Sequence, residues 1–255
     1  MKSLPRIMVA PNGARLNKAD HPALPVTIEE IVQTAKACHA AGADGLHAHV
    51  RDANEQHVLD VGLYRELQAE MRWQVPDMLV QITTEAVSRY TPETQMALVK
   101  KVRPQAVSVA FRELAQAADQ KAVRDFYRWA RAAGIAVQHI LYDQQDLDCW
   151  ARFVGEEPTS SHDFQVLLVL GSYSPGHLSV PEDLSPMLIR LKRLRPEAEW
   201  AVCAFGPNET ACLKRAFYLG GKARIGFENN MCQADGTTAA NNAARVAELV
   251  RAMSD

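Results

Sequence analysis

Three polar side chains alternate along the segment Gly45–Asp52, which reads GLHAHVRD. Successive side chains of a β-strand point to opposite faces, so His47, His49 and Arg51 would share one face of a strand here. Two imidazoles at this spacing can both reach one divalent ion, at about 2.0–2.1 Å each for zinc. The pattern also fits two packed core histidines or a solvated strand end. The adjoining charges favour a site, because charge on a strand of a sheet usually has a partner or a task.

A second segment, Lys222–Asn230, reads KARIGFENN and carries Glu228 near the end of another expected strand. Two histidines and one carboxylate leave coordination positions open on a metal ion, which is typical of catalytic rather than structural sites. We therefore expect His47, His49 and Glu228 to bind one catalytic metal ion.

The composition is that of an ordinary globular protein, with 47% hydrophobic and 23% charged residues among 255. The net charge of −2 does not suggest nucleic acid or an anionic membrane as a partner. The longest apolar runs, such as Phe164–Gly171, are too short to span a bilayer, and the N-terminal segment lacks a signal-peptide core. The five cysteines form no C-x-x-C pair and are expected to be reduced. These features favour a cytoplasmic protein.

Short β-branched segments alternate eight times with amphipathic helical segments, which predicts a parallel sheet with right-handed crossovers. Eight units of about 32 residues match the usual length of a closed (β/α)8 TIM barrel. The alternative is an open doubly wound sheet, but Ala10–Arg15 lacks the G-x-G-x-x-G turn that marks it. No linker composition interrupts the pattern, so residues 1–255 are expected to form a single α/β barrel domain.

The expected strands are Arg6–Pro11, Gly45–Asp52, Met78–Thr84, Ala106–Phe111, Ile135–Tyr142, Phe164–Gly171, Trp200–Phe205 and Ala223–Asn229. The expected helices are Thr27–Ala41, Asp60–Trp73, Pro92–Val102, Asp119–Ala133, Gln144–Val154, Pro181–Leu194, Asn208–Leu219 and Thr238–Met253. Loops are expected at Glu156–Asp163 and Ser172–Val180. Catalytic groups in such barrels collect at the C-terminal ends of the strands. The polar residues expected at this mouth are Asn12, Arg15, His47, His49, Arg51, Thr83, Thr84, Glu85, Ser108 and Glu228.

The chain resembles the β-keto acid cleavage enzymes, the family that includes 3-keto-5-aminohexanoate cleavage enzyme. The resemblance covers most of the chain and rests on H-x-H-x-R-D at His47–Asp52 combined with R-x-G-x-E-x-N at Arg224–Asn230. Members are zinc-dependent (β/α)8 barrels, commonly tetrameric, that react a β-keto acid with acetyl-CoA to give acetoacetate and a new acyl-CoA. Further similar segments are APNGAR at Ala10–Arg15, LPVTIEEI at Leu24–Ile31, QITTE at Gln81–Glu85 and AANNAARV at Ala239–Val246.

The resemblance implies one Zn2+ per chain on the two histidines and Glu228, acetyl-CoA as co-substrate, and a homo-oligomer, commonly a tetramer. It also implies Arg224 as an active-site arginine. Its guanidinium could hold a carboxylate or thioester charge, while zinc would act as a Lewis acid on the keto oxygen. The alternative for Arg224 is an ion pair that braces a barrel layer. Candidate substrate contacts are Thr83 or Thr84, Ser108, Asn12 and Arg15.

Three positions depart from the family pattern. The family usually reads E-D-N where this chain has Glu228-Asn229-Asn230, and an amide at Asn229 cannot act as a base. The acidic end of the family's fifth strand, P-E-x-E-x-F-D, corresponds here to Val137–Asp143, which keeps only the final Tyr-Asp. Arg15 stands where members that take an amino-bearing keto acid carry an acid.

The metal site is therefore intact in the sequence, whereas the family's acid is missing. Glu85 and His139 are the candidate replacement bases, and the alternatives are a solvated strand end for Glu85 and a packed core residue for His139. If Arg15 faces the mouth, it favours a substrate with a negative distal group; otherwise it pairs with a surface acid. Two other functions also fit: a metal-dependent aldolase or lyase without CoA, and a non-catalytic zinc-binding barrel.

Overall fold

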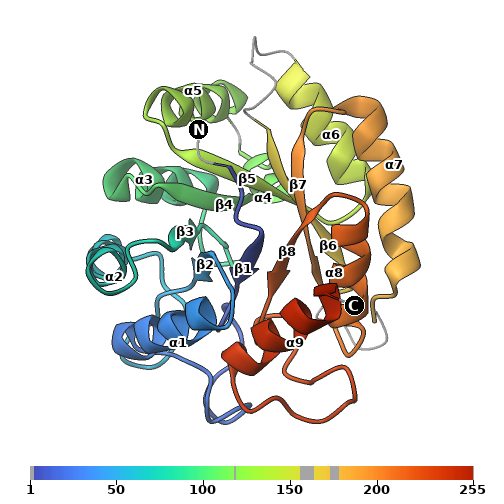
Figure 1. Cartoon of the computed structure of the whole chain (residues 1–255). Coiled ribbons are helices and arrows are strands. Elements are labelled where there is room, and N and C mark those ends of the chain that lie inside the picture. Colours follow the sequence, from blue (N-terminus) through green and yellow to red (C-terminus); the bar gives the residue numbers. More distant parts are fainter. Residues whose placement is uncertain (1–2, 118, 156–163, 173–177, 255) are drawn as a thin grey trace.

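In the computed structural model, eight parallel strands close into a barrel in chain order, with the helices around it (Figure 1). The structure describes residues 3–117, 119–155, 164–172 and 178–254. Strand β1 pairs with both β2 and β8, so the predicted (β/α)8 barrel is confirmed and the open sheet is excluded. The expected loop Glu156–Asp163 and most of Ser172–Val180 lie outside the described residues.

All predicted strands and helices occur, with shifted ends, and a short helix after β4 is added. None of the described helices is both long enough and apolar enough to cross a membrane. The strands are β1 (Ile7–Val9), β2 (Gly45–Ala48), β3 (Leu79–Thr83), β4 (Ala106–Ala110), β5 (Ala136–Leu141), β6 (Gln165–Leu170), β7 (Glu199–Ala204) and β8 (Lys222–Ile225). The helices are α1 (Ile28–Ala40), α2 (Val61–Gln74), α3 (Pro92–Val102), α4 (Phe111–Leu114), α5 (Gln120–Ala132), α6 (Gln144–Gly155), α7 (Leu184–Leu194), α8 (Glu209–Tyr218) and α9 (Asn242–Ser254), with a 3-10 turn, η2 (Pro181–Asp183), before α7.

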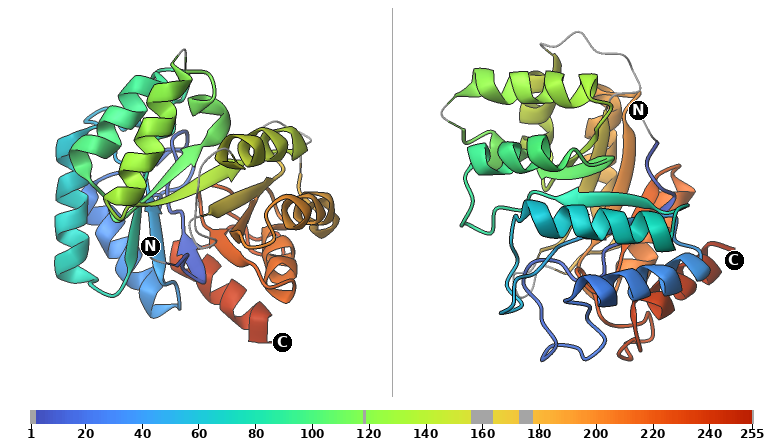
Figure 2. Two further views of the ribbon diagram at one scale, coloured as in Figure 1. Left: turned by 90° about the horizontal axis from the view of Figure 1, so that it is seen from above. Right: turned by 90° about the vertical axis from the view of Figure 1, so that its left-hand side faces the viewer.

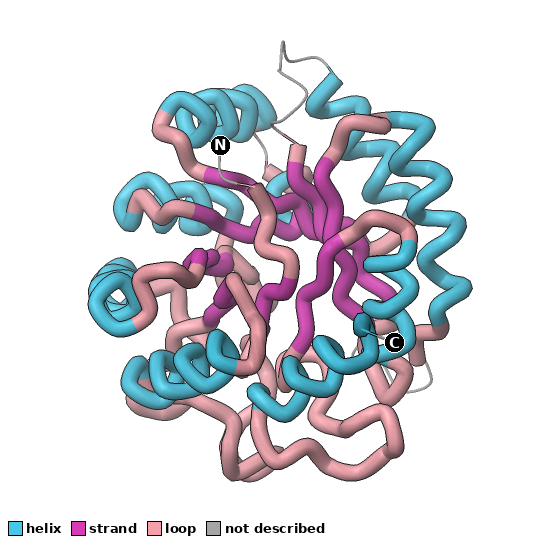
Figure 3. Tube along the Cα trace, viewed as in Figure 1, coloured by secondary structure: helices cyan, strands magenta, loops and turns pink. Residues whose placement is uncertain are grey.

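Local sequence chemistry starts several of these helices. Thr27 and Glu30 form a capping box on α1, in which each side chain accepts the other residue's backbone N–H. The side chains of Asp60, Thr91 and Asp119 cap α2, α3 and α5 in the same position. The helices enclose the strands (Figure 3), and α1 and α9 lie side by side where the barrel closes (Figure 2).

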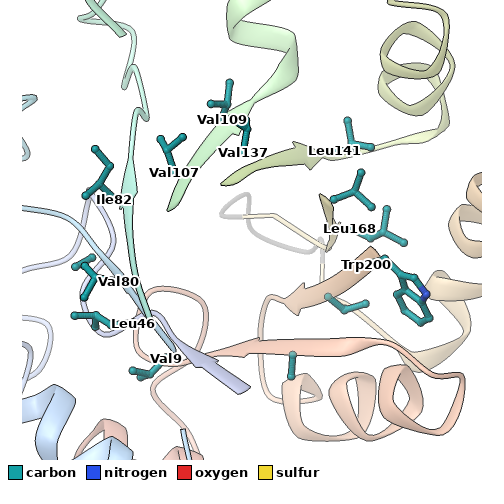
Figure 4. Packing of buried hydrophobic residues seen from close by; sticks show 14 of the residues in the cluster. Val9, Leu46, Val80, Ile82, Val107, Val109, Val137, Leu141, Leu168 and Trp200 are labelled. Atoms are coloured by element: carbon teal, nitrogen blue, oxygen red, sulfur yellow. The ribbon is translucent and has the colours of Figure 1, made fainter. Parts of the chain in front are cut away.

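The outward faces of the strands pack against the helices and form the main hydrophobic core (Figure 4). Val9, Leu46, Ile82 and Val107 belong to it and are almost completely buried, and each such side chain contributes about 1.5–3 kcal/mol by leaving water. Because side chains alternate, the residues between them face the barrel interior. On β6 and β7 this interior carries the apolar residues Leu167, Val169, Ala201 and Cys203, in addition to the hydrogen-bonded pair Gln165 and Glu199. On β2 to β5 it carries the polar residues His47, Gln81, Thr83, Ser108 and Gln138.

All eight strands end earlier than predicted, and the early ends of β8 and β2 change how the candidate ligands are held. Strand β8 ends at Ile225 because Gly226 has φ +143°, and a Cβ there would lie 2.4 Å from the Ala10 carbonyl oxygen. Glu228 therefore lies in the turn after β8 and not on the strand. Strand β2 ends at Ala48, so His49 lies just beyond it.

Candidate metal centre and active-site cavity

His47, His49 and Glu228 converge at the C-terminal end of the barrel. The Nε2 atoms of the two histidines are 3.1 Å apart, and each lies 3.5 Å from Oε2 of Glu228. A tetrahedral zinc ion with bonds of about 2.0–2.1 Å needs ligand atoms about 3.3–3.4 Å apart. The three donor atoms therefore have the spacing of three corners of a tetrahedral site, and the residues present fit zinc.

The three side chains also have the protonation states that a divalent metal requires. Burial lowers the pKa of His47 to about 4 and that of His49 well below its ordinary value, so both imidazoles are neutral at pH 7. Burial acts to raise the pKa of Glu228, but the charge of Arg224 and the contacts with the two histidines outweigh it and hold this pKa below its usual range. Arg224 Nη2 donates to Glu228 Oε1 at 3.0 Å. Metal binding therefore needs no costly deprotonation of these groups.

The segment after β1 holds both ligand-bearing segments in place. Asn12 Nδ2 donates to the His49 carbonyl oxygen at 2.8 Å, and the His49 N–H donates to Asn12 Oδ1 at 3.3 Å. The Glu228 N–H donates to the Ala10 carbonyl oxygen at 3.1 Å. Gly13 lies against the candidate ligand Glu228, since a Cβ there would be 2.7 Å from Glu228 Cγ. Asn12 thus positions His49 and does not line the cavity.

The segment AANNAARV braces the turn that carries Glu228. The Phe227 N–H donates to Asn242 Oδ1 at 2.9 Å, and the Asn242 amide donates to a carbonyl after β1. Arg245 and Glu209 form a fully buried ion pair of 2.7 Å, and the other Glu209 oxygen accepts the Gly226 N–H at 3.4 Å. The resemblance in this segment therefore has a structural basis at the ligand turn.

A cavity of about 260 Å³ adjoins the three candidate ligands. Three arginines and two glutamates face it, so a bound divalent ion would make it strongly cationic. Its apolar wall comes from the later strands of the barrel. The lining residues are Arg15, His47, His49, Thr83, Glu85, Ala110, Arg112, Ile140, Tyr142, Val169, Gly171, Ser172, Phe205, Arg224 and Glu228.

Glu85 lines the cavity beside the candidate ligands. Its Oε2 is 3.8 Å from His49 Nδ1, and its Oε1 is 3.6 Å from Arg15 Nη2. Burial and the nearby charge of Glu228 raise the pKa of Glu85 to about 7, although Arg15 acts in the opposite direction. Its side chain is only 21% exposed, so the structure does not describe a solvated strand end. A carboxyl group in this setting is suited to proton transfer near neutral pH.

The loop that carries Glu85 is held under backbone strain. Val87 and Ser88 have φ of 44° and 57°, a left-handed conformation that is costly for a β-branched residue. Gln95 Nε2 donates to Glu113 Oε2 at 2.6 Å, and the same carboxylate accepts the backbone N–H of Ala86, the residue after Glu85. These contacts fix the backbone on the N-terminal side of the strained turn.

Three other predicted residues lie outside the cavity lining. Thr84 Oγ1 donates to the Ser108 carbonyl oxygen at 3.1 Å, while the Ser108 side chain is buried inside the barrel. Asn229 is 7% exposed, and its carboxamide atoms have no hydrogen-bond partner in the described part of the chain. The structure therefore brings Arg15, Thr83, Glu85 and Arg224 to the cavity with the ligands, and places these three elsewhere.

His139 lies on the outer face of β5, away from the cavity. Its ring centroid is 5.2 Å from that of Tyr127 and 5.6 Å from that of Trp150, and its Nδ1 is 3.3 Å from the Gln165 carbonyl oxygen. Strand alternation explains this, because its neighbour Gln138 faces the interior. The structure therefore places His139 in the packed core, where it cannot reach a substrate in the cavity.

Arg112 and Tyr142 line the cavity but were not predicted as site residues. The Arg112 guanidinium stacks over the Tyr142 ring at 4.3 Å and pairs with Asp143 at 2.8 Å and Asp146 at 2.7 Å. Tyr142 directly follows β5 and Arg112 lies two residues after the end of β4, at the end of the barrel where such folds carry their sites. That signal was present in the sequence.

Comparisons with known proteins agree with this architecture. The family described as beta-keto acid cleavage enzyme matches residues 6–255. The 3-keto-5-aminohexanoate cleavage enzyme of Acetoanaerobium sticklandii is 26% identical over 94% of this chain and 88% of its own length. The 3-oxoadipate:acetyl-CoA acetyltransferase of Cupriavidus necator is also 26% identical, over 95% and 86%. The solved complex of ObcA with oxaloacetate has a TM-score of 0.68 at 14% identity and shares the fold; the alignment covers 90% of this chain and 63% of that one.

Proposed function

The chain belongs to the beta-keto acid cleavage enzyme family, and we propose that it transfers the acyl group of a β-keto acid to CoA, with acetyl-CoA as co-substrate and zinc as cofactor. The observation that carries the proposal is the spacing of His47, His49 and Glu228 beside Glu85 in a cationic cavity. The names of the acyltransferase relatives support acetyl-CoA as the second substrate.

The proposed reaction converts R–CO–CH2–COO⁻ and acetyl-CoA into acetoacetate and R–CO–SCoA. A proton leaves C2 of the keto acid, C2 forms a bond to the acetyl carbon, and CoA thiolate departs. The thiolate then attacks the keto carbon C3, the C2–C3 bond breaks, and the proton returns to C2. Atoms and charge balance without any oxidant or reductant.

Side chains around the cavity would divide this work. Glu85 would accept the C2 proton and return it, and would so take the role of the acid that the family carries at the position of Asn229. Arg224 would hold the substrate carboxylate, and the Thr83 hydroxyl would contact the same substrate. Zinc bound to the ligand triad would supply Lewis acidity toward the keto oxygen.

The charges of the cavity favour an anionic substrate with a second negative group. Arg15 faces the cavity, where three arginines outweigh two glutamates, and a bound metal ion would add further positive charge. The Arg15 side chain is 54% exposed and already pairs with Glu85, so the preference that it gives for a distal carboxylate on the substrate should be modest.

Labelled acetyl-CoA tests the reaction directly. The zinc-loaded protein is incubated with a panel of β-keto acids and [13C2]acetyl-CoA, and products are identified by mass spectrometry. We expect labelled acetoacetate and unlabelled acyl-CoA in equal amounts, and neither from the Glu228→Gln variant. Cleavage of a keto acid without acetyl-CoA would instead identify a metal-dependent aldolase or lyase. Label in the new acyl-CoA would contradict the proposed bond changes.

A further inference from the structure

A line of side-chain hydrogen bonds crosses the barrel interior and ends on His47. Gln81 Oε1 lies 2.8 Å from His47 Nδ1, and Gln81 Nε2 donates to Gln138 Oε1 at 3.0 Å. Gln138 Nε2 then donates to the Val166 carbonyl oxygen at 3.4 Å. His47, Gln81 and Gln138 are each only 1% exposed, so bulk water does not compete for these bonds.

The last acceptor determines the direction of the whole line. A backbone carbonyl can only accept, so Gln138 must turn its amide nitrogen to Val166 and its oxygen to Gln81. Gln81 must then turn its nitrogen to Gln138 and its oxygen to His47. An amide oxygen accepts only, so His47 must carry its hydrogen on Nδ1. The orientation of each amide is otherwise ambiguous, but here it follows from the preceding hydrogen bond, counted from Val166 toward His47.

This direction matters because the other ring nitrogen of His47 faces the metal site. Nε2 is the atom that lies 3.1 Å from His49 Nε2 and 3.5 Å from Glu228 Oε2. With hydrogen on Nδ1, Nε2 presents a lone pair to a metal; with the opposite tautomer, an N–H would occupy that place. We propose that Gln81 and Gln138 are positioning residues of the metal centre, which act by holding His47 in its ligand tautomer. This inference rests on the proposed metal site.

The strand register makes room for the line. His47 and Gln81 are direct neighbours on β2 and β3, but Gln138 lies on β5, beyond β4. The inward positions of β4 are Ala106, in register with Gln81, and Ser108, in register with Gln138. Their small side chains let the two amides meet across β4. Neither glutamine lines the cavity, so each can affect the metal only through His47.

Metal affinity separates this role from a general packing role. Zinc affinity of the metal-free protein is measured by competition with a chromophoric chelator. Gln81→Met keeps the volume but removes the acceptor, and we expect affinity to fall about 10–100-fold, as for other partners of metal-bound histidines. Gln138→Met frees Gln81 to flip, so a smaller loss is expected. Gln81→Glu keeps an acceptor and should restore affinity to within a few-fold of wild type.

The matched control is Gln165→Met, which removes another buried amide of the barrel interior, one that donates to Glu199. This variant should change the free energy of unfolding but not zinc affinity. Equal losses in Gln165→Met and Gln81→Met would overturn the inference, as would wild-type affinity in Gln81→Met. Thermal unfolding of each metal-free variant establishes that it is folded under the assay conditions.

The tautomer can be observed without metal. Long-range 1H–15N spectra of 15N-histidine-labelled, metal-free protein distinguish the two nitrogens of each neutral ring, and His47→Gln assigns the signal. We expect His47 as the Nδ1–H form in wild type and a mixture in Gln81→Met. An Nε2–H form of His47 in the wild type would refute the proposed direction of the hydrogen-bond line even if zinc binds. If His47 has the expected tautomer but the protein binds no zinc, the proposed function is refuted, whereas the direction of the hydrogen-bond line is confirmed.

Discussion

Replacing Glu85 with glutamine should separate its role in proton transfer from its effect on stability. The amide keeps the shape of the side chain but cannot accept a proton from carbon. General-base catalysis typically contributes about 10²–10⁴-fold to rate, so kcat of the zinc-loaded Glu85→Gln variant should fall by that factor. The variant should still contain zinc, because Glu85 Oε2 lies 3.8 Å from His49 and Glu85 is not one of the three ligands.

The same substitution should stabilise the metal-free protein at neutral and alkaline pH. Burial raises the pKa of Glu85 from 4.5 to about 7, so between these values the unfolded chain ionises more readily than the folded one. The stability of the wild type therefore falls as pH rises from 4.5 to 7 and is lower by about 3 kcal/mol above that range. Glu85→Gln removes this penalty, so its advantage should be largest at pH 8 and vanish below about pH 4.5.

Urea unfolding of metal-free protein at several pH values measures the stability effect, and steady-state acetoacetate formation measures the rate. Glu66→Gln, at an exposed position of α2, is the control for a changed surface carboxylate. A kcat within a few-fold of wild type would refute Glu85 as the base. A stability difference that does not vary with pH would refute its burial as an ionisable group.

Two further substitutions test the cavity and the ligand turn. Arg15→Glu should reverse the preference among β-keto acids that differ only in a distal carboxylate or ammonium group. Because Arg15 is half exposed, the change should be about 1 kcal/mol, or roughly fivefold in kcat/KM. An unchanged ranking of substrates would show that Arg15 does not determine specificity. Gly13→Ala should lower zinc affinity because its Cβ would displace Glu228. The control is Gly134→Ala, also at positive φ but with open space around it, which should cost about 1–2 kcal/mol of stability and leave zinc affinity unchanged. Equal zinc affinities in the two variants would show that Gly13 does not position Glu228.

Much of the barrel could be predicted from the sequence because its units repeat. The alternation of short β-branched segments with amphipathic helices determined element order and closure. Strand ends were less predictable, because they depend on contacts from distant segments. Gly226 ends β8 through its approach to Ala10, a residue more than two hundred positions away in the chain, and this contact moves Glu228 from a strand into a turn.

The candidate site was predictable where spacing alone brings residues together, as for His47 and His49. It was less predictable on β5, because both faces of a barrel strand are buried and the pattern does not show which face is inward. Gln138 and His139 are both polar and adjacent, yet only Gln138 faces the interior. Gln81 carries no signature of its own, since an amide is significant here only through its contacts with His47 and Gln138.

Zinc content is the most direct measurement of the central claim, the metal centre of His47, His49 and Glu228. Elemental analysis of protein purified without added chelator should give about one zinc per chain in wild type. The His47→Ala/His49→Ala double variant, which loses two of the three donor atoms, should contain almost none while it remains folded. Equal zinc in the wild type and the folded double variant would contradict the assignment.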